Sequence, residues 1–357
     1  MSRTIRQMLE QREREQLAPF ACLSAESRGR LRPEQDECDL RTVFQRDRDR
    51  ILHTKTFRRL KHKTQVFLAP AGDHYRTRLT HVLEVAQIAR TVAVSLRLNE
   101  YLAEAIALGH DLGHTPFGHA GETMLNQLHP GGFKHYIQSL RVVDVLENRG
   151  RGLNLTWEVR NGIVKHSKGQ KEVLPENPTE TPTTMEGQVV RLADIMAYVN
   201  HDLDDAIRAG LLQEDDVPAE IRRVVGDNSS RRIDAMVRDL VQETIAADEG
   251  CLKMSGRMLG AVNHLRAFLY ERVYRNERVH NEFVKAQKII HDLYAFFLEH
   301  EFPDSELSPC QTHDFLRRVE GAGAAHRCVC DFIAGMTDRY ALDLFSQIFI
   351  PRPWGAF

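Results

Sequence analysis

The 357-residue chain lacks the features that mark several classes of protein. It has no apolar run near the roughly 18 residues that a membrane-spanning helix needs, and its first residues contain no apolar signal segment. Its six cysteines form no CxxC pair, which argues against a cysteine-rich zinc site and suits a reducing compartment. These absences favour a cytoplasmic protein that does not enter a membrane.

Strand-like alternation of apolar and polar residues is also scarce. Apolar residues instead recur at three- and four-residue steps, the spacing of one face of an α-helix. The pattern is clear in the segments 79–96, 102–106, 140–146 and 189–199. The sequence therefore predicts an all-α fold.

Charge of one sign is not in excess. The formal net charge is −2, so no global field draws the protein to nucleic acid or lipid. We expect a polar N-terminal arm over residues 1–40, a core over 41–210 and a C-terminal helical region over 211–357 packed on that core. A stretch rich in Pro and Thr at about 173–184 is expected to be a mobile loop.

Histidine, by contrast, is concentrated: eleven of 17 lie between residues 53 and 201. The sharpest anomaly there is the pair His110-Asp111. We expect a helix over 100–112 that ends with Gly113 in a left-handed conformation. Asp111 would then face the negative end of the helix dipole at a cost of about 0.3–1 kcal/mol, which a divalent cation would offset. The alternative is a solvated carboxylate beside a core histidine.

A further histidine, His81, lies near the start of the preceding predicted helix. A short connection joins the two helices, so we expect them to pack antiparallel. That packing brings the first turn of one helix beside the last turn of the other. His81 is therefore expected to join His110 and Asp111 as a third metal ligand.

A fourth ligand is expected from Asp194, which shares a helix stripe with Tyr198 and Asp202 at positions i, i+4 and i+8. The alternative for this stripe is a solvated helix face. His201 could replace Asp194 as a ligand, although it lies off the stripe. Two histidines and two carboxylates suit Mn, Fe, Co, Ni or Mg, and they leave coordination positions for water and substrate.

The segment after the His-Asp pair carries His114 and His119, separated by Gly and Pro. Thr115 and Pro116 are expected to cap and begin the next helix. Glu122 lies three residues beyond His119, and so on the same helix face, where a carboxylate can hold a histidine that acts as general acid or base. The alternative is a surface turn.

Two more residues are candidates for binding an anion. Arg78 lies one helical turn before His81 and is suited to hold a phosphate. His135 precedes another predicted helix and could either bind substrate or serve the structure. The basic run at 58–63 is expected to be mainly a solvated helix face.

Together these motifs resemble the HD-domain phosphohydrolases and, more narrowly, the deoxynucleoside triphosphate triphosphohydrolase family. The resemblance spans nearly the whole chain, and the combination of RLTH with HDLGHTPFGHAGE is its most specific part. The matching stretches are 44–51, 57–65, 78–86, 110–122, 138–141, 193–202 and 331–340. It implies an HD-domain helical bundle with additional N- and C-terminal helices.

The resemblance also implies a reaction: cleavage of a deoxynucleoside triphosphate (dNTP) between the 5′ oxygen and the α-phosphorus, giving deoxynucleoside and inorganic triphosphate. The residues that would bind the divalent metal are His81, His110, Asp111 and Asp194. The residues that would form the catalytic turn are His114, His119 and Glu122, with His119 protonating the leaving oxygen.

The same resemblance assigns the substrate contacts. Arg78 and His135, with His114, would contact phosphates. Tyr198 would stack on the sugar, where it disfavours a 2′ hydroxyl, and Asp202 with Gln65 would sense the 3′ hydroxyl. The family commonly forms homo-oligomers and can be activated by nucleotides at separate sites.

Two other functions stay open on the sequence. One is another HD-type phosphohydrolase acting on a nucleoside monophosphate or cyclic nucleotide, which product analysis separates from the first. The other is a regulator that binds nucleotide or single-stranded nucleic acid, whose biological effect would survive His119→Ala.

Overall fold

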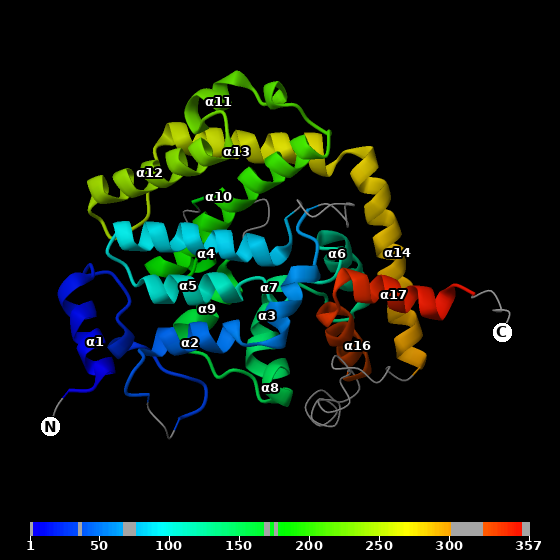
Figure 1. Ribbon diagram of the computed structural model, residues 1–357, viewed down its shortest axis with the longest axis horizontal. Coiled ribbons are helices and arrows are strands. Elements are labelled where there is room, and N and C mark those ends of the chain that lie inside the picture. Colours follow the sequence, from blue (N-terminus) through cyan, green and yellow to red (C-terminus); the bar gives the residue numbers. More distant parts are fainter. Residues whose placement is uncertain are drawn as a thin grey trace, which may run out of the picture.

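The computed structural model describes residues 3–34, 38–66, 76–167, 172–174, 178–300 and 324–351 (Figure 1). Within these ranges the regular elements are helices, and the only β-type pairings are two isolated bridges. The predicted all-α fold is confirmed.

The helices before the centre of the chain are α1 (Ile5–Gln16), α2 (Val43–Leu52), α3 (Lys55–Arg59), α4 (Arg78–Ser95), α5 (Glu100–Gly109), α6 (His119–Leu128), α7 (His135–Arg141), α8 (Glu147–Gly150) and α9 (Trp157–Lys165). The later helices are α10 (Met185–Arg208), α11 (Ala219–Val225), α12 (Ser229–Ala247), α13 (Gly256–Leu269), α14 (Glu277–Glu299), α16 (Ala324–Gly335) and α17 (Asp338–Phe349). Two π-helical turns, η3 (Val142–Leu146) and η6 (Tyr270–Tyr274), extend α7 and α13.

The main core is built around α10, which packs against α4, α5 and α9 (Figure 1). Helices α4 and α5 pack against each other as the sequence predicts, and both are lined with small and branched apolar residues such as Val85, Ala89 and Ile106. Small side chains let the helix backbones approach closely. This close packing brings together the start of α4 and the ends of α5 and α9, where the histidines of the site lie.

A second core joins α6 to the C-terminal helices α14, α16 and α17. Its buried members include Phe117, Leu125, Phe133 and Phe332. Because Phe117 lies in the turn before α6, this second core fixes that turn against the C-terminal helices.

Two expected helix boundaries were wrong. Helix α5 ends at Gly109 rather than at residue 112, because the Gly113 N–H, which the longer helix would direct at the Gly109 carbonyl, donates to the Ser139 hydroxyl across 2.8 Å, and that hydroxyl donates to the His110 carbonyl. Gly113 is not left-handed. It is needed for close packing, since a Cβ there would lie 2.1 Å from the Ser139 backbone nitrogen.

Helix α6 begins at His119 rather than at Pro116. Phe117 and Gly118 have φ values of 61° and 55°, which a right-handed helix does not accept. The Thr115 hydroxyl does not cap a helix but donates to the Gly118 carbonyl across 2.9 Å. The segment 113–118 is therefore a tight turn that delivers His119 at the first position of α6.

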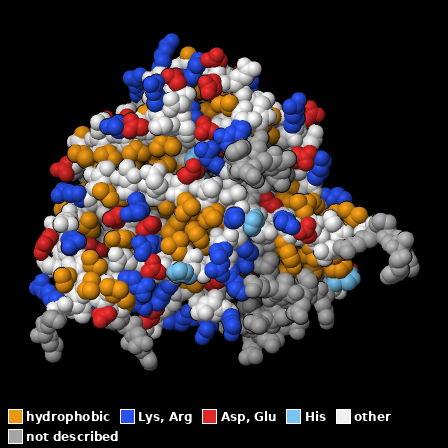
Figure 2. Space-filling model, in the orientation of Figure 1, with side chains coloured by type: hydrophobic (Ala, Val, Ile, Leu, Met, Phe, Trp, Pro, Cys, Tyr) orange, Lys and Arg blue, Asp and Glu red, His pale blue; other side chains and the backbone are white. Residues whose placement is uncertain are grey.

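Basic and acidic side chains are interspersed on the face shown in Figure 2, in keeping with the small net charge. Among the described residues, no helix is both long enough and apolar enough to cross a membrane. In the segment 173–184, which was expected to be mobile, residues 175–177 lie outside the described residues, and 178–180 form a short 3-10 helix.

Candidate metal and catalytic site

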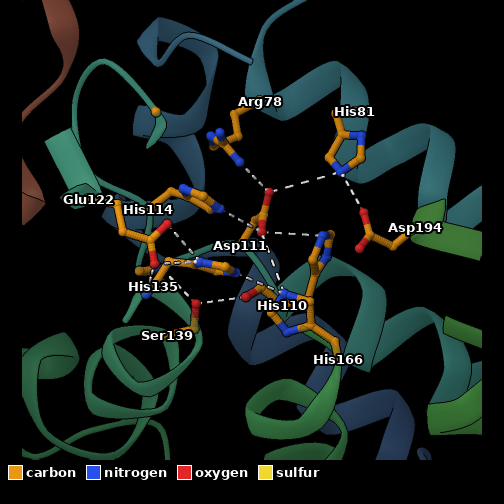
Figure 3. A network of polar contacts seen from close by, with 12 residues as sticks. Arg78, His81, His110, Asp111, His114, Glu122, His135, Ser139, His166 and Asp194 are labelled. Carbon is orange, nitrogen blue, oxygen red and sulfur yellow. Dashed lines mark hydrogen bonds and ion pairs between the residues drawn. The ribbon is translucent and has the colours of Figure 1, made fainter. Parts of the chain in front are cut away.

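Three of the predicted metal ligands lie together at the meeting point of α4 and α5 (Figure 3). His81 comes from the first turn of α4, and His110 and Asp111 follow the end of α5. Each offers one ligand atom, and these atoms all lie within 4.8 Å of one another. All three residues are buried, with at most 3% of each exposed.

The donor set fits a divalent ion. The Nδ1 of His110 donates to the Ala107 carbonyl across 2.6 Å, so Nε2 is the ring nitrogen left to face the cluster. That Nε2 is buried and has no hydrogen-bond partner among the described residues. A buried imidazole nitrogen without such a partner, 3.4 Å from the Asp111 carboxylate, is the arrangement a metal completes.

Asp194 on α10 extends this group, because its Oδ1 lies 3.3 Å from Nε2 of His81. The structure thus brings together all four residues expected to hold metal. His201, the substitute that the sequence left open, points elsewhere: its Nε2 lies 3.0 Å from Glu84.

Asp111 is the centre of the cluster. Arg78 donates to its Oδ2 across 2.6 Å, and Nε2 of His114 lies 3.3 Å from its Oδ1. Burial opposes ionisation, but His110, His114 and Arg78 outweigh it and hold the pKa of Asp111 well below its ordinary value. Asp111 is therefore an anion, as a metal ligand must be.

A second group of possible ligand atoms consists of Asp111, His114 and His135. The rings of His114 and His135 stack with their centroids 4.0 Å apart. Burial, with Arg78 nearby, lowers the pKa of His114 well below its ordinary value.

Glu122 serves two histidines. Its Oε2 lies 3.5 Å from Nδ1 of His119, the pairing that the sequence predicts, and its Oε1 lies 3.0 Å from Nδ1 of His135. Burial works against its charge, but hydrogen bonds from both histidines lower the pKa of Glu122. The His119 side chain is 71% exposed, so it stands on the solvent side of the cluster.

Sequence reasoning missed His166, at the end of α9. Its Nε2 lies 3.9 Å from Asp111 and 3.3 Å from Nε2 of His135. The Nδ1 of His166 donates to the Ile163 carbonyl across 2.7 Å, so its Nε2 is an acceptor and His135 donates to it. Since Nδ1 of His135 faces the Glu122 carboxylate, both of its ring nitrogens face acceptors.

Only the general concentration of histidines in the sequence pointed toward His166, because no local pattern surrounds it. Burial lowers the pKa of His166 to about 3, in agreement with its role as a neutral acceptor.

The predicted stripe on α10 contacts two residues from the C-terminal part of the chain that were not among the predicted site residues. Arg266 on α13 donates to the Tyr198 hydroxyl across 2.7 Å, and the Tyr274 hydroxyl in η6 donates to the Asp202 carboxylate. Burial raises the pKa of Asp202 to about 7. The stripe is thus half-buried against α13 rather than a solvated face.

Gln65 lies close to Arg78 because its neighbour in the chain, Thr64, contacts that arginine. The Thr64 carbonyl accepts a hydrogen bond from Nε of Arg78 across 3.2 Å, and the Gln65 side-chain oxygen is buried with no partner in the part of the chain that the structure describes. An unpaired buried acceptor next to the arginine leaves a hydrogen-bonding position for a ligand hydroxyl.

Two protein families match parts of this chain. The HD domain family matches residues 78–198, and the family described as phosphohydrolase-associated domain matches residues 252–347. A solved structure of a hypothetical protein from Aquifex aeolicus overlaps with a TM-score of 0.45 at 17% identity, over 85% of this chain and 71% of that chain.

Relatives match over nearly their full length. A deoxyguanosinetriphosphate triphosphohydrolase-like protein from Desulfatibacillum aliphaticivorans is 54% identical, over 98% of this chain and 99% of its own. Proteins of the same description from Caldanaerobacter subterraneus and Clostridium perfringens are 52% and 47% identical, each over 98% of this chain and over 97% and 98% of their own. The chain belongs to the deoxyguanosinetriphosphate triphosphohydrolase-like family of HD-domain phosphohydrolases.

Proposed function

We propose that this protein hydrolyses dNTPs to deoxynucleoside and inorganic triphosphate with the help of a divalent metal ion. The observation that carries the proposal is the buried group His81, His110 and Asp111, extended by Asp194 and contacted by the Arg78 guanidinium. The relatives bear the name of such an enzyme, and the site has the parts that this reaction needs.

The four metal-binding residues are His81, His110, Asp111 and Asp194. When bound, a divalent ion such as Mn²⁺ or Mg²⁺ supplies a Lewis acid for the α-phosphoryl oxygen and lowers the pKa of a water ligand. Arg78 keeps Asp111 ionised and oriented for this role through its 2.6 Å hydrogen bond.

The chain's own residues then bind and position the triphosphate. His135 lies between two acceptors, Glu122 and His166, which favour the protonated ring and so suit it to bind phosphate oxygens. Arg78 and His114 contact the two oxygens of the Asp111 carboxylate, Oδ2 and Oδ1, and would complete a set of donors for the phosphate chain.

His119 is the proposed general acid. It is the exposed member of the histidine group, and Glu122 lies 3.5 Å from its ring nitrogen, where it stabilises the protonated form. From that position His119 would protonate the 5′ oxygen as the bond to the α-phosphorus breaks. His114 lies next to it, with ring centroids 6.0 Å apart.

Tyr198, Asp202 and Gln65 form the proposed sugar site. Arg266 fixes the Tyr198 hydroxyl, so the ring presents a rigid face to the sugar. Asp202 and Gln65 each keep a buried side-chain oxygen without a partner among the described residues, and the 3′ hydroxyl would donate its single hydrogen bond to one of these two oxygens.

The test is a product analysis in water labelled with ¹⁸O. The Mn²⁺-loaded protein is incubated with each of the four dNTPs, alone and mixed. We expect equal amounts of deoxynucleoside and tripolyphosphate, with the label in tripolyphosphate because water attacks phosphorus. Release of orthophosphate or pyrophosphate as the first product would overturn the proposal and favour another HD-type reaction.

Two variants complete the experiment. His119→Ala is expected to lower kcat by about 10²–10⁴-fold, the usual contribution of general acid catalysis. His280→Ala, an exposed histidine on α14, is the matched control and is expected to keep full activity. Activity on the mixture but on no single dNTP would reveal activation by a second nucleotide.

A further inference from the structure

Three segments that are far apart in the sequence contact one another, and one of them is the catalytic turn. They are residues 63–65 after α3, the turn 114–118 before α6, and the junction of α16 and α17 at 334–338. The contacts join the C-terminal helices directly to the turn that carries His114 and delivers His119. Two charged side chains make most of them.

Lys63 is one of the two. Its side chain is 1% exposed, and its Nζ donates to the His114 carbonyl and to the Ala334 carbonyl, the latter across 2.8 Å. Burial lowers the pKa of Lys63 to about 7, which shows that keeping an ammonium group here is costly. No role in the proposed reaction explains a fully buried lysine, but the two backbone contacts do.

Asp338 is the other. Its Oδ1 accepts from the Phe117 backbone N–H across 2.9 Å, and its Oδ2 accepts from the Thr64 backbone N–H across 2.8 Å. One carboxylate thus ties the catalytic turn to the segment that contains Gln65. Asp338 is 6% exposed, and Thr337 caps the helix that it begins.

The turn needs such restraint because its backbone is strained. Phe117 has a φ of 61°, in the left-handed region that residues with a bulky side chain rarely adopt. A conformation of this kind persists only where its surroundings fix it. The hydrogen bond to Asp338 holds its N–H, and the second core buries its ring at 4% exposure.

We propose that Lys63 and Asp338 are positioning residues that bracket the catalytic turn and hold His114 and His119 in register with Asp111. The inference rests on the proposed function for its kinetic consequences. It assigns a role in catalysis to the C-terminal helices: they fix the geometry of a turn to which they contribute no reacting group.

Asp338→Asn tests the bracket with almost no change of volume. An amide can accept from only one of the two backbone N–H groups, so one restraint is lost. We expect kcat to fall by roughly 10–100-fold, because small displacements of catalytic groups are expensive, while KM and Mn²⁺ affinity change by less than about threefold. Asp343→Asn, exposed on the same helix, is the control.

Lys63→Met removes the other restraint and is expected to lower kcat in the same way, whereas Lys63→Arg keeps N–H donors and recovers part of it. Lys61→Met, at an exposed lysine two positions away, should have no effect. Unchanged kcat in both Asp338→Asn and Lys63→Met would overturn the proposal. So would a loss of kcat that tracks a loss of Mn²⁺ affinity.

A measurement independent of activity separates this inference from the proposed function. Amide hydrogen exchange in residues 114–120 should accelerate at least about tenfold in Asp338→Asn, with exchange in α5 unchanged. If the wild-type protein releases no triphosphate, the proposed function fails. This exchange comparison alone then decides whether Lys63 and Asp338 restrain the catalytic turn. Unchanged exchange in 114–120 would reject it.

Discussion

Glu122 Oε1 lies 3.0 Å from Nδ1 of His135, although the two residues are 13 positions apart in the chain. The same carboxylate lies 3.5 Å from His119. One partly buried anion therefore supports both a proposed phosphate ligand and the proposed general acid. The charge of Glu122 is thus expected to influence substrate binding and proton transfer together.

Glu122→Gln is expected to reduce kcat by about 10²-fold or more and to raise KM, because neither histidine keeps a stabilising anion. Steady-state kinetics between pH 6 and 9 would show it as a lost or displaced ionisation. Gln127→Ala, on the exposed side of the same helix, should behave as wild type. A kcat within about threefold of wild type would contradict this shared role.

His166→Phe keeps a ring of similar size but removes the acceptor that faces His135. We expect KM for the dNTP to rise by roughly tenfold, since a hydrogen bond to a charged group is lost, with a smaller effect on kcat. Inhibition by tripolyphosphate should weaken in parallel. An unchanged KM would show that His135 does not need His166.

Metal binding can be measured without turnover. Saturating Mn²⁺ should raise the thermal midpoint of the wild type, in line with about 2.7 kcal/mol at a hundredfold excess over Kd, and EDTA should reverse the rise. Asp194→Asn should abolish most of this shift, whereas Asp234→Asn, an exposed aspartate on α12, should retain it. Equal shifts in both variants would remove Asp194 from the ligand set.

Asp202→Asn should stabilise the protein in alkaline solution. Burial raises the pKa of Asp202 in the folded state from 3.8 to about 7, so the folded state holds a proton that the unfolded chain has lost. That contribution is complete below pH 3.8 and disappears as the pH rises through 7. At pH 8 the variant should gain about 1–3 kcal/mol, with little change at pH 4.

The same substitution is expected to weaken dNTP binding, because the sugar site loses its carboxylate. Chemical denaturation at the two pH values, beside a KM measurement, tests both effects. A variant that is less stable than wild type at pH 8 would contradict the assigned sign.

Gly113→Ala is expected to destabilise the protein by about 3 kcal/mol or more, because its Cβ would lie 2.1 Å from the backbone nitrogen of Ser139. Gly260→Ala is the matched control in α13, where a Cβ would meet nothing within 4 Å. It should be neutral or stabilise by roughly 0.4–1 kcal/mol. Thermal unfolding of the two variants checks both signs.

Local periodicity explains how much of the site the sequence could predict. Asp194, Tyr198 and Asp202 lie on one stripe because the helical repeat dictates it, and α10 spans all three. The antiparallel packing of α4 and α5 followed from a short connection, which brought His81 to His110 and Asp111. The specific motifs also placed the chain in its family before any geometry was known.

Helix ends were less predictable, since long-range contacts set them. Ser139, from α7, ends α5 by accepting the Gly113 N–H, and Asp338, from α17, holds the backbone of the turn before α6. Neither partner is near in sequence. Thr115 and Pro116 looked like a helix start because their local propensity agrees with one.

The sequence by itself determined the all-α class, the family and the four residues expected to hold metal, because each rests on a repeat or a motif within a short stretch. Only the tertiary structure decided that Glu122 serves two histidines, that His166 stands behind His135, and that Lys63 and Asp338 restrain the catalytic turn. Those relationships join helices through side chains at single positions. No periodic pattern encodes such pairs, because packing of the two cores selects them.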